Sequence, residues 1–281
     1  MAAKATTRRR QLGAMMRKLR ARKGITLEEA GRLVGVSKAT ISRYETQQGP
    51  VKWLVVEALC REYGASDAER QAVVALAKEA KQQNWWHSFA DYLPESASLL
   101  LTLEDEAVRE DHFACVYVPG LLQTRSYAEA VQHASEMRRP PEEIEQLVNL
   151  RIKRQAILSR PRPPHLWIVL DESVLRRVVG SRETMRAQLA RLLEANEAPG
   201  ITLQVLPFAK GAHSAAKGSF VILGGPEPSL DVVYVETHVG SLFMEKDEEL
   251  DHYRLAFDYL RAQALDMAAS SALIEAARRE M

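Results

Sequence analysis

The sequence predicts two domains: an N-terminal all-α domain of five helices containing a helix-turn-helix, residues 1–84, and a C-terminal α+β domain with a mixed or antiparallel sheet, residues 85–281. The length of 281 residues fits about two domains. Residues 1–62 hold 14 Lys and Arg against 5 Asp and Glu, a net +9, whereas residues 63–281 hold 24 against 32, a net −8. The pattern is helical before Trp85, and strand-like runs alternate with helices after it.

The composition is that of a globular protein, with 46% hydrophobic and 27% charged residues. It excludes collagen-like, disordered and disulfide-rich classes. The two cysteines, Cys60 and Cys115, form no disulfide framework and fit a reducing compartment. No apolar run approaches the roughly 18 residues of a membrane span, and the basic residues near Met1 precede no apolar signal segment. We therefore expect a soluble, cytoplasmic protein with no membrane partner.

Helix signals follow one another through the first domain. Gly24 ends a first helix, and a second begins at Thr26, which forms a capping box with Glu29. A turn at Gly35 leads to a third helix capped by Ser37. A break follows at Gly49-Pro50, and a fourth helix is expected over residues 51–63. Ser66 or Asp67 would cap a last helix, which completes the domain. The side chains expected to face the core are Leu12, Met15, Met16, Leu19, Leu27, Ala30, Leu33, Val36, Ile41 and Tyr44.

The helix after Ser37 has a short, polar and basic outward face. This face suits the major groove of DNA, where Lys and Arg bind guanine acceptors and a methyl-sized side chain contacts thymine. We expect Lys38 and Arg43 to contact bases. Residues 8–10, Arg17, Lys18, Arg20, Arg22 and Lys23 are expected to neutralise phosphates. The predicted DNA-contacting set is Arg17, Arg20, Thr26, Ser37, Lys38, Ala39, Thr40, Ser42 and Arg43.

At these residues the chain resembles the XRE, or lambda-repressor-like, helix-turn-helix family. Its pattern T-x-E-E-x-A, then V-S-x-x-x-I-S-R-x-E, then Gly and Pro, is present from Thr26 to Pro50. The resemblance implies a five-helix DNA-binding domain. Two positions depart from the pattern. Leu27 stands where glutamine is common, which removes one usual polar contact to DNA, and Gly31 stands where an alanine often follows, which predicts looser helix packing.

The second domain is predicted from short β-branched and aromatic runs bounded by Gly, Pro or Asp. The last four runs are separated by short linkers, which favours some antiparallel pairing. Predicted strands are 112–118, 165–170, 201–207, 219–223, 232–236 and 241–245. Predicted helices are 124–137, 142–159, 182–196 and two near the end of the sequence.

Stretches such as "WWHSFADYLP", "VPGLLQT", "LDESVLRRVVG" and "VLPFAKGAH" resemble the C-terminal domain of a group of actinomycete regulators. These have an XRE domain followed by a domain of unknown function, and they are described as antitoxin-like. The resemblance implies a small partner protein. It implies no catalytic residue or ligand.

No motif for catalysis or cofactor binding is present. The seven histidines form neither HExxH nor a set with CxxC, so we expect no metal. Lys217-Gly218-Ser219 has the wrong order for a phosphate loop, and no serine has the G-x-S-x-G setting of a hydrolase. We therefore expect a protein that is not an enzyme, with no catalytic residues and no cofactor.

A dense aromatic segment and a Pro-Gly turn remain as candidates for a partner or ligand site. The aromatic side chains could pack the linker onto the second domain or cover a pocket, and the leucines of "VPGLLQT" could fill the core or a partner's groove. The candidate partner residues are Trp85, Trp86, Tyr92, Leu121 and Leu122.

Together these features predict a sequence-specific DNA-binding transcriptional regulator that binds double-stranded DNA as a homodimer. Its C-terminal domain is expected to sense a partner protein or a signal. One alternative is an antitoxin-like adaptor that mainly binds a small partner protein. The other is a regulator that senses a small molecule.

Overall fold

A computed structural model describes residues 7–46, 51–79, 85–93, 95–136, 138–225, 228, 231–238 and 240–281. For residues 7–10, 79, 87, 90 and 95 it describes the backbone alone. Contacts divide the chain into two compact units, Met1–His87 and Ser88–Met281. The division falls three residues after the position that the sequence suggests.

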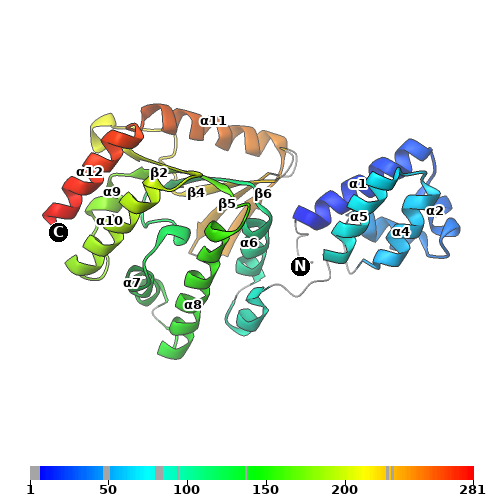
Figure 1. Ribbon diagram of the computed structural model, residues 1–281, viewed down its shortest axis with the longest axis horizontal. Helices are drawn as coiled ribbons and strands as arrows, with labels where there is room; N and C mark the ends of the chain where they lie inside the picture. The colour runs from blue at the N-terminus through cyan, green and yellow to red at the C-terminus, as the bar shows by residue number, and fades with distance from the viewer. Residues whose placement is uncertain are drawn as a thin grey trace. The chain divides into compact units, whose positions relative to one another are not determined.

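The first unit is helical and contains the five predicted helices (Figure 1). Gly24, at φ +74°, ends α1, and Ser66 accepts a hydrogen bond from the Glu69 N–H at the start of α5. The expected break at Gly49-Pro50 lies outside the described residues. The helices are α1 Thr7–Lys23, α2 Leu27–Leu33, α3 Lys38–Thr46, α4 Trp53–Glu62 and α5 Asp67–Glu79. Their core includes Leu12, Met16, Ala30, Ile41, Tyr44, Val56, Leu59 and Val73.

The second unit is built on a mixed six-stranded sheet of order β3-β2-β1-β4-β5-β6. β1 pairs in parallel with β2 and antiparallel with β4, so the strand direction changes beside β1. The expected α+β domain with a mixed sheet is confirmed. The strands are β1 Arg109–Ala114, β2 His165–Asp171, β3 Ile201–Leu206, β4 Phe220–Gly224, β5 Val232–Thr237 and β6 Gly240–Met244.

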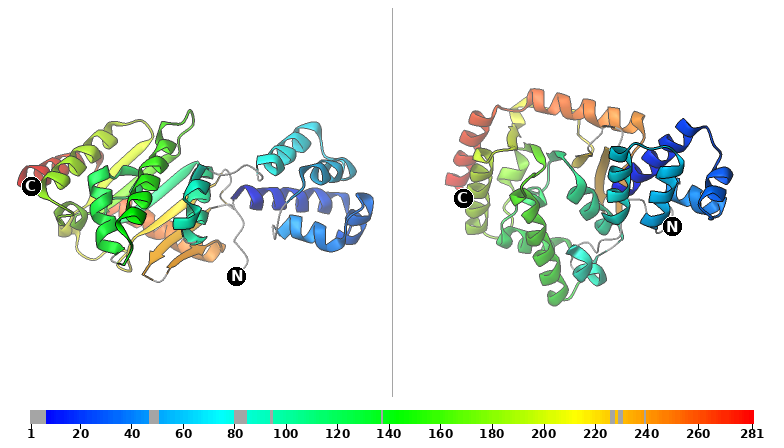
Figure 2. Two further views of the ribbon diagram at one scale, coloured as in Figure 1. Left: turned by 90° about the horizontal axis from the view of Figure 1, so that it is seen from below. Right: turned by 45° about the vertical axis from the view of Figure 1, so that its right-hand side comes forward.

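Helices cover both faces of this sheet (Figures 1 and 2). α11 packs on one face, where Phe257 and Leu260 meet Phe113 and Phe220. On the opposite face, Ile168 of β2 packs with helices that follow β1 and β2. The helices are α6 Glu95–Glu106, α7 Arg125–Ser135, α8 Pro141–Arg154, α9 Ser173–Arg176, α10 Arg182–Glu197, α11 Asp247–Gln263 and α12 Met267–Glu280. Short 3-10 helices are η1 Trp85–Tyr92, η2 Gly120–Leu122, η3 Gln155–Ser159 and η4 Phe208–Lys210.

Side chains close the outer edge of β3. The Leu203 N–H donates to Asn196 Oδ1 at 3.1 Å, and the Val205 N–H donates to Ser270 Oγ at 2.9 Å. These two bonds satisfy donors that an uncovered edge strand would present to another chain.

The first strand differs from its prediction. It runs over Arg109–Ala114 rather than 112–118, because the apolar segment from Cys115 to Val118 leaves the sheet and leads into η2. The strand instead buries Glu110 and His112, which face the same side of the sheet. α6 and α9 were not predicted.

A buried polar cluster lies between β1, α6 and α8. His112 Nε2 is 2.8 Å from Glu110 Oε2, and Arg154 Nε is 2.8 Å from Glu104 Oε2. Burial raises the pKa of Glu110 to about 8 and lowers the pKa of His112 to about 4. Burial also raises the pKa of Glu104, and the Arg154 guanidinium opposes that rise. Glu110 therefore carries a proton at neutral pH and can donate it to the neutral imidazole of His112.

No helix in the described part of the chain is long and apolar enough to cross a membrane.

Candidate nucleic-acid interface

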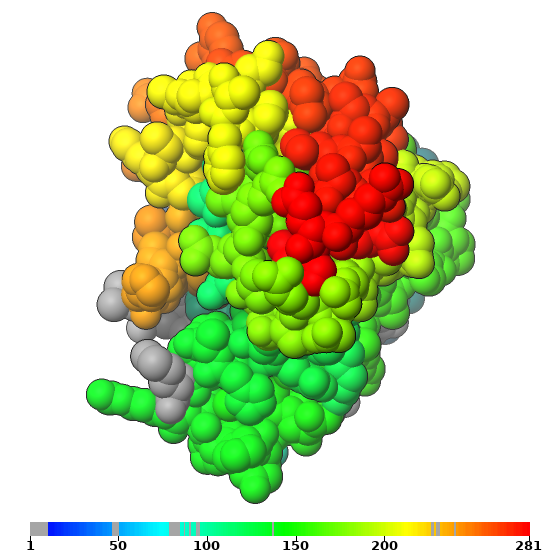
Figure 3. All heavy atoms as spheres, turned by 90° about the vertical axis from the view of Figure 1, so that its left-hand side faces the viewer, coloured from blue at the N-terminus to red at the C-terminus, as the bar shows by residue number. Residues whose placement is uncertain are grey.

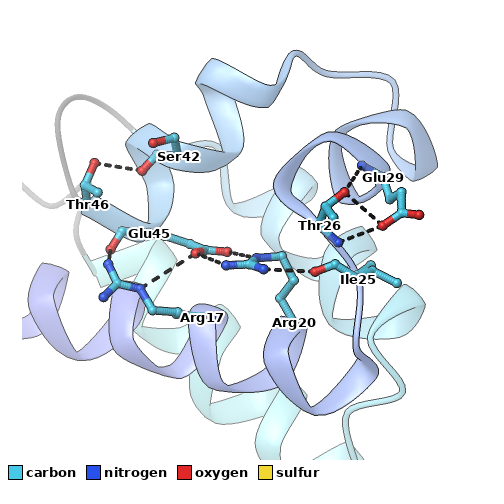
Figure 4. A network of polar contacts seen from close by, with 8 residues as sticks. All are labelled: Arg17, Arg20, Ile25, Thr26, Glu29, Ser42, Glu45 and Thr46. Carbon is cyan, nitrogen blue, oxygen red and sulfur yellow. Dashed lines mark hydrogen bonds and ion pairs between the residues drawn. The ribbon is translucent and has the colours of Figure 1, made fainter.

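The candidate interface is built on α2, the following turn and α3. Thr26 opens α2 with the predicted capping box (Figure 4). The Glu29 N–H donates to Thr26 Oγ1 at 3.2 Å, and the Thr26 N–H donates to Glu29 Oε2 at 2.7 Å. The hydrogen bond from the Thr26 backbone lowers the pKa of Glu29. Thr26 thus fixes the start of α2, and its hydroxyl is engaged in the cap.

The turn between the two helices is tight because Gly31 has no side chain. The Val36 N–H donates to the Gly31 carbonyl at 2.9 Å, and a Cβ at Gly31 would lie 2.5 Å from the Val36 carbonyl oxygen. Gly35 takes φ +69° within the turn. The expectation of looser packing at Gly31 is therefore wrong: glycine permits the turn to approach α2 more closely than alanine would.

The core face of the motif is largely as predicted. Ala30, Ile41 and Tyr44 are buried. Leu33, however, is 49% exposed, which corrects the prediction that it faces inward. Val34 follows Leu27 by seven residues and Ala30 by four, so it returns to their helix face more closely than Leu33 does. Val34 packs on the core in place of Leu33.

An ion pair joins α1 to α3 (Figure 4). Arg20 Nε and Nη2 donate to the two carboxylate oxygens of Glu45 at 2.6 and 2.8 Å, and Nη1 donates to the Ile25 carbonyl at 2.9 Å. The side chains are 17% and 4% exposed. The bond to Glu45 raises the pKa of Arg20. Arg20 was predicted to contact phosphate, but its donors are used inside the domain, where they fix the position of α3.

The exposed face of α3 carries the residues that are predicted to contact DNA bases. Lys38, Ala39 and Arg43 are exposed, and Ser42 is half-buried beside them. Lys38 and Arg43 have no ion pair within the described residues. One cationic side chain lies at each end of this short face.

Ser37 and Thr40 organise the start of α3. The Thr40 N–H donates to Ser37 Oγ at 3.1 Å, which confirms Ser37 as the helix cap. Arg43 Nη2 donates to Thr40 Oγ1 at 3.2 Å, so the guanidinium lies along the exposed face. Thr46 Oγ1 donates to the Ser42 carbonyl (Figure 4).

The cations of α1 have different roles. Arg17 is 59% exposed and donates to the Glu45 carbonyl at 3.3 Å, so it lies beside α3. Lys18 and Lys23 are exposed, with no ion pair in the described part of the chain. Arg22, in contrast, binds both carboxylate oxygens of Glu69, at 2.7 and 3.0 Å. The side chains of residues 8–10 lie outside the described set.

The candidate partner residues are largely internal. Leu121 and Leu122 are fully buried and pack with Tyr127 and Leu189 in the core, which is the alternative left open for the "VPGLLQT" turn. Trp86 is 5% exposed, and its ring contacts that of Trp85 edge-on. The Tyr92 carbonyl accepts a hydrogen bond from Arg139 Nη1 at 3.1 Å.

Thr124 accepts the Tyr127 N–H and so caps α7, as the sequence predicts. Cys60 and Cys115 are free thiols. Within the described residues, no group of three or more His, Cys, Asp or Glu side chains could hold a metal ion.

Two family models match the chain. A helix-turn-helix domain matches residues 11–73, and these include most of α1 and all of α2 and α3. A domain of unknown function, DUF5753, matches residues 97–276, which is most of the mixed-sheet unit. Neither the curated proteins nor the solved structures contain a match. The second match covers more than half of the 281 residues, and the chain therefore belongs to the DUF5753 family, with a helix-turn-helix domain preceding the domain that defines it.

Proposed function

We propose that the protein is a sequence-specific, DNA-binding transcriptional regulator of the XRE type. The observation that carries the proposal is the face of α3, where exposed Lys38, Ala39 and Arg43 lie on a helix fixed by the Arg20–Glu45 ion pair. In helix-turn-helix proteins the second helix of the motif enters the major groove. A rigid attachment matters because base contacts depend on the register of that helix.

The residue types suggest how the contacts are divided. Arg43 and Lys38 would bind guanine acceptors, and Ala39 would contact a thymine methyl group. Ser37, Thr40 and Ser42 would hold the backbone in register, and Arg17 would neutralise a phosphate beside them.

One recognition helix covers only a few base pairs. A homodimer would place two copies of α3 on half-sites about one helical turn apart, and the operator would be a pseudo-palindrome.

The second unit is proposed to receive a signal, as a partner-binding, antitoxin-like domain. Two features favour this role. The second unit is larger than a helix-turn-helix needs for support, and its net charge is opposite in sign to that of residues 1–62. The candidate occupant is a small partner protein. A DNA-bound regulator of this kind is cytoplasmic and has no catalytic task. The runner-up is an adaptor with weak DNA affinity, or a unit that senses a small molecule.

A selection of bound fragments from genomic DNA, followed by titrations at several salt concentrations, tests the proposal. A regulator yields a shared sequence motif with two half-sites. Its affinity falls steeply with salt and exceeds non-specific affinity by roughly 10³-fold or more. An adaptor yields no shared motif, and its affinity differs little from one DNA sequence to another. That result would overturn the proposal.

A further inference from the structure

Three exposed apolar side chains lie where the three parallel strands end. Val116 follows β1, Val178 follows α9 at the end of β2, and Phe208 follows β3. They are 44%, 51% and 57% exposed. Because the carboxyl ends of parallel strands meet at one edge of a sheet, the three segments lie at the same edge. We call Val116, Val178 and Phe208 together the carboxyl-edge patch.

Hydrogen bonds join these segments. Ser173 Oγ donates to the Cys115 carbonyl at 2.8 Å, and the Phe208 N–H donates to Glu172 Oε2 at 3.0 Å. Figure 3 looks onto this side, where the yellow loop after β3 lies against the yellow-green segment after β2 and α12 is red beside them. These bonds hold the beginnings of the three segments next to one another.

In the described part of the chain, the segments that carry the patch hold charges of both signs, but their acids are engaged while three of their cations are not. Arg177, Lys210 and Lys217 are exposed and, within the described residues, make no ion pair. The nearby acid Glu172 is engaged, since it binds Arg176 at 3.0 Å as well as the Phe208 N–H. Residues 63–281 nevertheless carry a net charge of −8. Unpaired cations around exposed apolar side chains are thus a local exception on an acidic domain.

We propose that the carboxyl-edge patch docks a protein segment in which an apolar side chain is flanked by carboxylates. The apolar side chain would cover Val116, Val178 and Phe208, and the carboxylates would pair with Arg177, Lys210 and Lys217. An interface with an apolar centre and a polar rim has this composition. The assignment rests on the proposed partner-binding role of the second unit. It takes exposed side chains as the contact, in place of the buried Trp86 and Leu121.

Other occupants fit less well. DNA would engage the cations through its phosphates and leave the apolar side chains in water. In a symmetric dimer the same patch would meet itself, and two sets of unpaired cations would face one another. A partner with complementary charge removes both difficulties.

The test is selection of binders to the full-length protein from a display library of short random peptides. The expected sequences combine Leu, Phe or Trp with Asp and Glu. One selected peptide is then titrated against variants. Phe208→Ser, and separately Arg177→Glu with Lys210→Glu, should each weaken binding about tenfold or more, which corresponds to about 1.4 kcal/mol. The control Leu255→Ser removes an apolar side chain that is 56% exposed on α11 and should change nothing.

The proposal is overturned if no peptide is enriched, if the enriched peptides lack acidic residues, or if Phe208→Ser and the charge reversal leave binding intact. Dissociation of an oligomer by Phe208→Ser would assign the patch to contacts between copies, which also contradicts it. The same variants are titrated with DNA. If the peptide selection fails while the full-length protein still binds its DNA motif, the patch is wrong and the proposed DNA-binding function stands. Near-ultraviolet circular dichroism checks the folding of each variant.

Discussion

Arg20 and Glu45 are 25 residues apart, and their bidentate ion pair ties α1 to α3 in the helical unit. Arg20→Ala leaves the carboxylate of Glu45 buried with, among the described residues, only the exposed Arg17 nearby, its Nε 3.8 Å away, and Glu45→Ala removes the carboxylate from the half-buried Arg20. We expect Arg20→Ala and Glu45→Ala each to destabilise this unit by about 3–5 kcal/mol. Amide hydrogen exchange over residues 11–46 of the full chain measures the loss.

The control is Arg22→Ala. Its partner Glu69 is 35% exposed and Arg22 itself 50%, so solvent screens this pair and the change should cost far less than Arg20→Ala. Equal protection in the Arg20 and Arg22 variants would show that the buried pair does not fix α3.

Arg43→Ala tests the reading face. We expect a loss of about 1–3 kcal/mol at one base position and a relaxed preference there, with stability unchanged because Arg43 is exposed. Repeating the fragment selection with the variant measures this. Arg61→Ala, which removes an exposed arginine paired with Glu57 on α4, is the matched control. If the Arg43 variant selects the same motif with the same affinity, Arg43 does not contact a base.

Gly31→Ala tests whether close packing at the turn outweighs helix propensity, because the two predict opposite changes in the stability of the helical unit. Propensity alone predicts stabilisation by about 1 kcal/mol. The Cβ would, however, lie 2.5 Å from the Val36 carbonyl oxygen, which belongs to the backbone and cannot rotate away. We expect destabilisation by about 1–3 kcal/mol, measured by urea unfolding. A more stable variant would mean that the turn can relax without cost.

The buried pair of Glu110 and His112 should make stability depend on pH. The raised pKa of Glu110, about 8, means that the folded protein holds a proton that the unfolded chain loses near 4.5. Stability therefore falls as pH rises between these values. His112 opposes this only between about 4 and 6.5, because its pKa is lowered.

From pH 6.5 to 8 the Glu110 contribution is unopposed by His112, and we expect a loss of about 1–2 kcal/mol. Glu110→Gln keeps the shape of the neutral acid and should remove the larger part of this slope in urea unfolding. The remainder belongs to buried Glu104, whose pKa is raised to about 7. Glu275→Gln should leave it intact, because the pKa of Glu275 is lowered to about 2 by Arg278. A slope in the Glu110 variant as steep as that of the unsubstituted protein would assign the proton to another group.

Local signals in the sequence were sufficient to predict the helix-turn-helix. Thr26, Glu29, Ser37 and Gly24 act through neighbours within four residues, so their roles follow from spacing alone. Arg20 could not be assigned in this way, because an outward arginine and one paired with a distant acid look alike in sequence. The spacing of Glu45 could have indicated the pair. Glu45 follows the buried Ile41 by four residues, so it occupies an inward position where a carboxylate needs a cationic partner.

In the second unit, local sequence patterns were not sufficient to predict the sheet. β1 was predicted three residues too late because its buried polar side chains, Glu110 and His112, hide the hydrophobic pattern of a core strand. The order of the strands depends on crossovers and not on any local pattern. The direction change beside β1, where Arg109 pairs with both His165 and Gly224, therefore required the structure.

The central place of β1 has a consequence for synthesis on the ribosome. Its antiparallel neighbour β4 ends at Gly224, more than a hundred residues after β1 begins. At 5–20 residues per second, roughly 5–20 s separate the emergence of the two strands. The helical unit, whose contacts are local, can fold and become competent for DNA in that interval, while one side of β1 still awaits its partner. The nascent chain thus passes through a stage in which the proposed DNA-binding unit is folded and the domain proposed to control it is not.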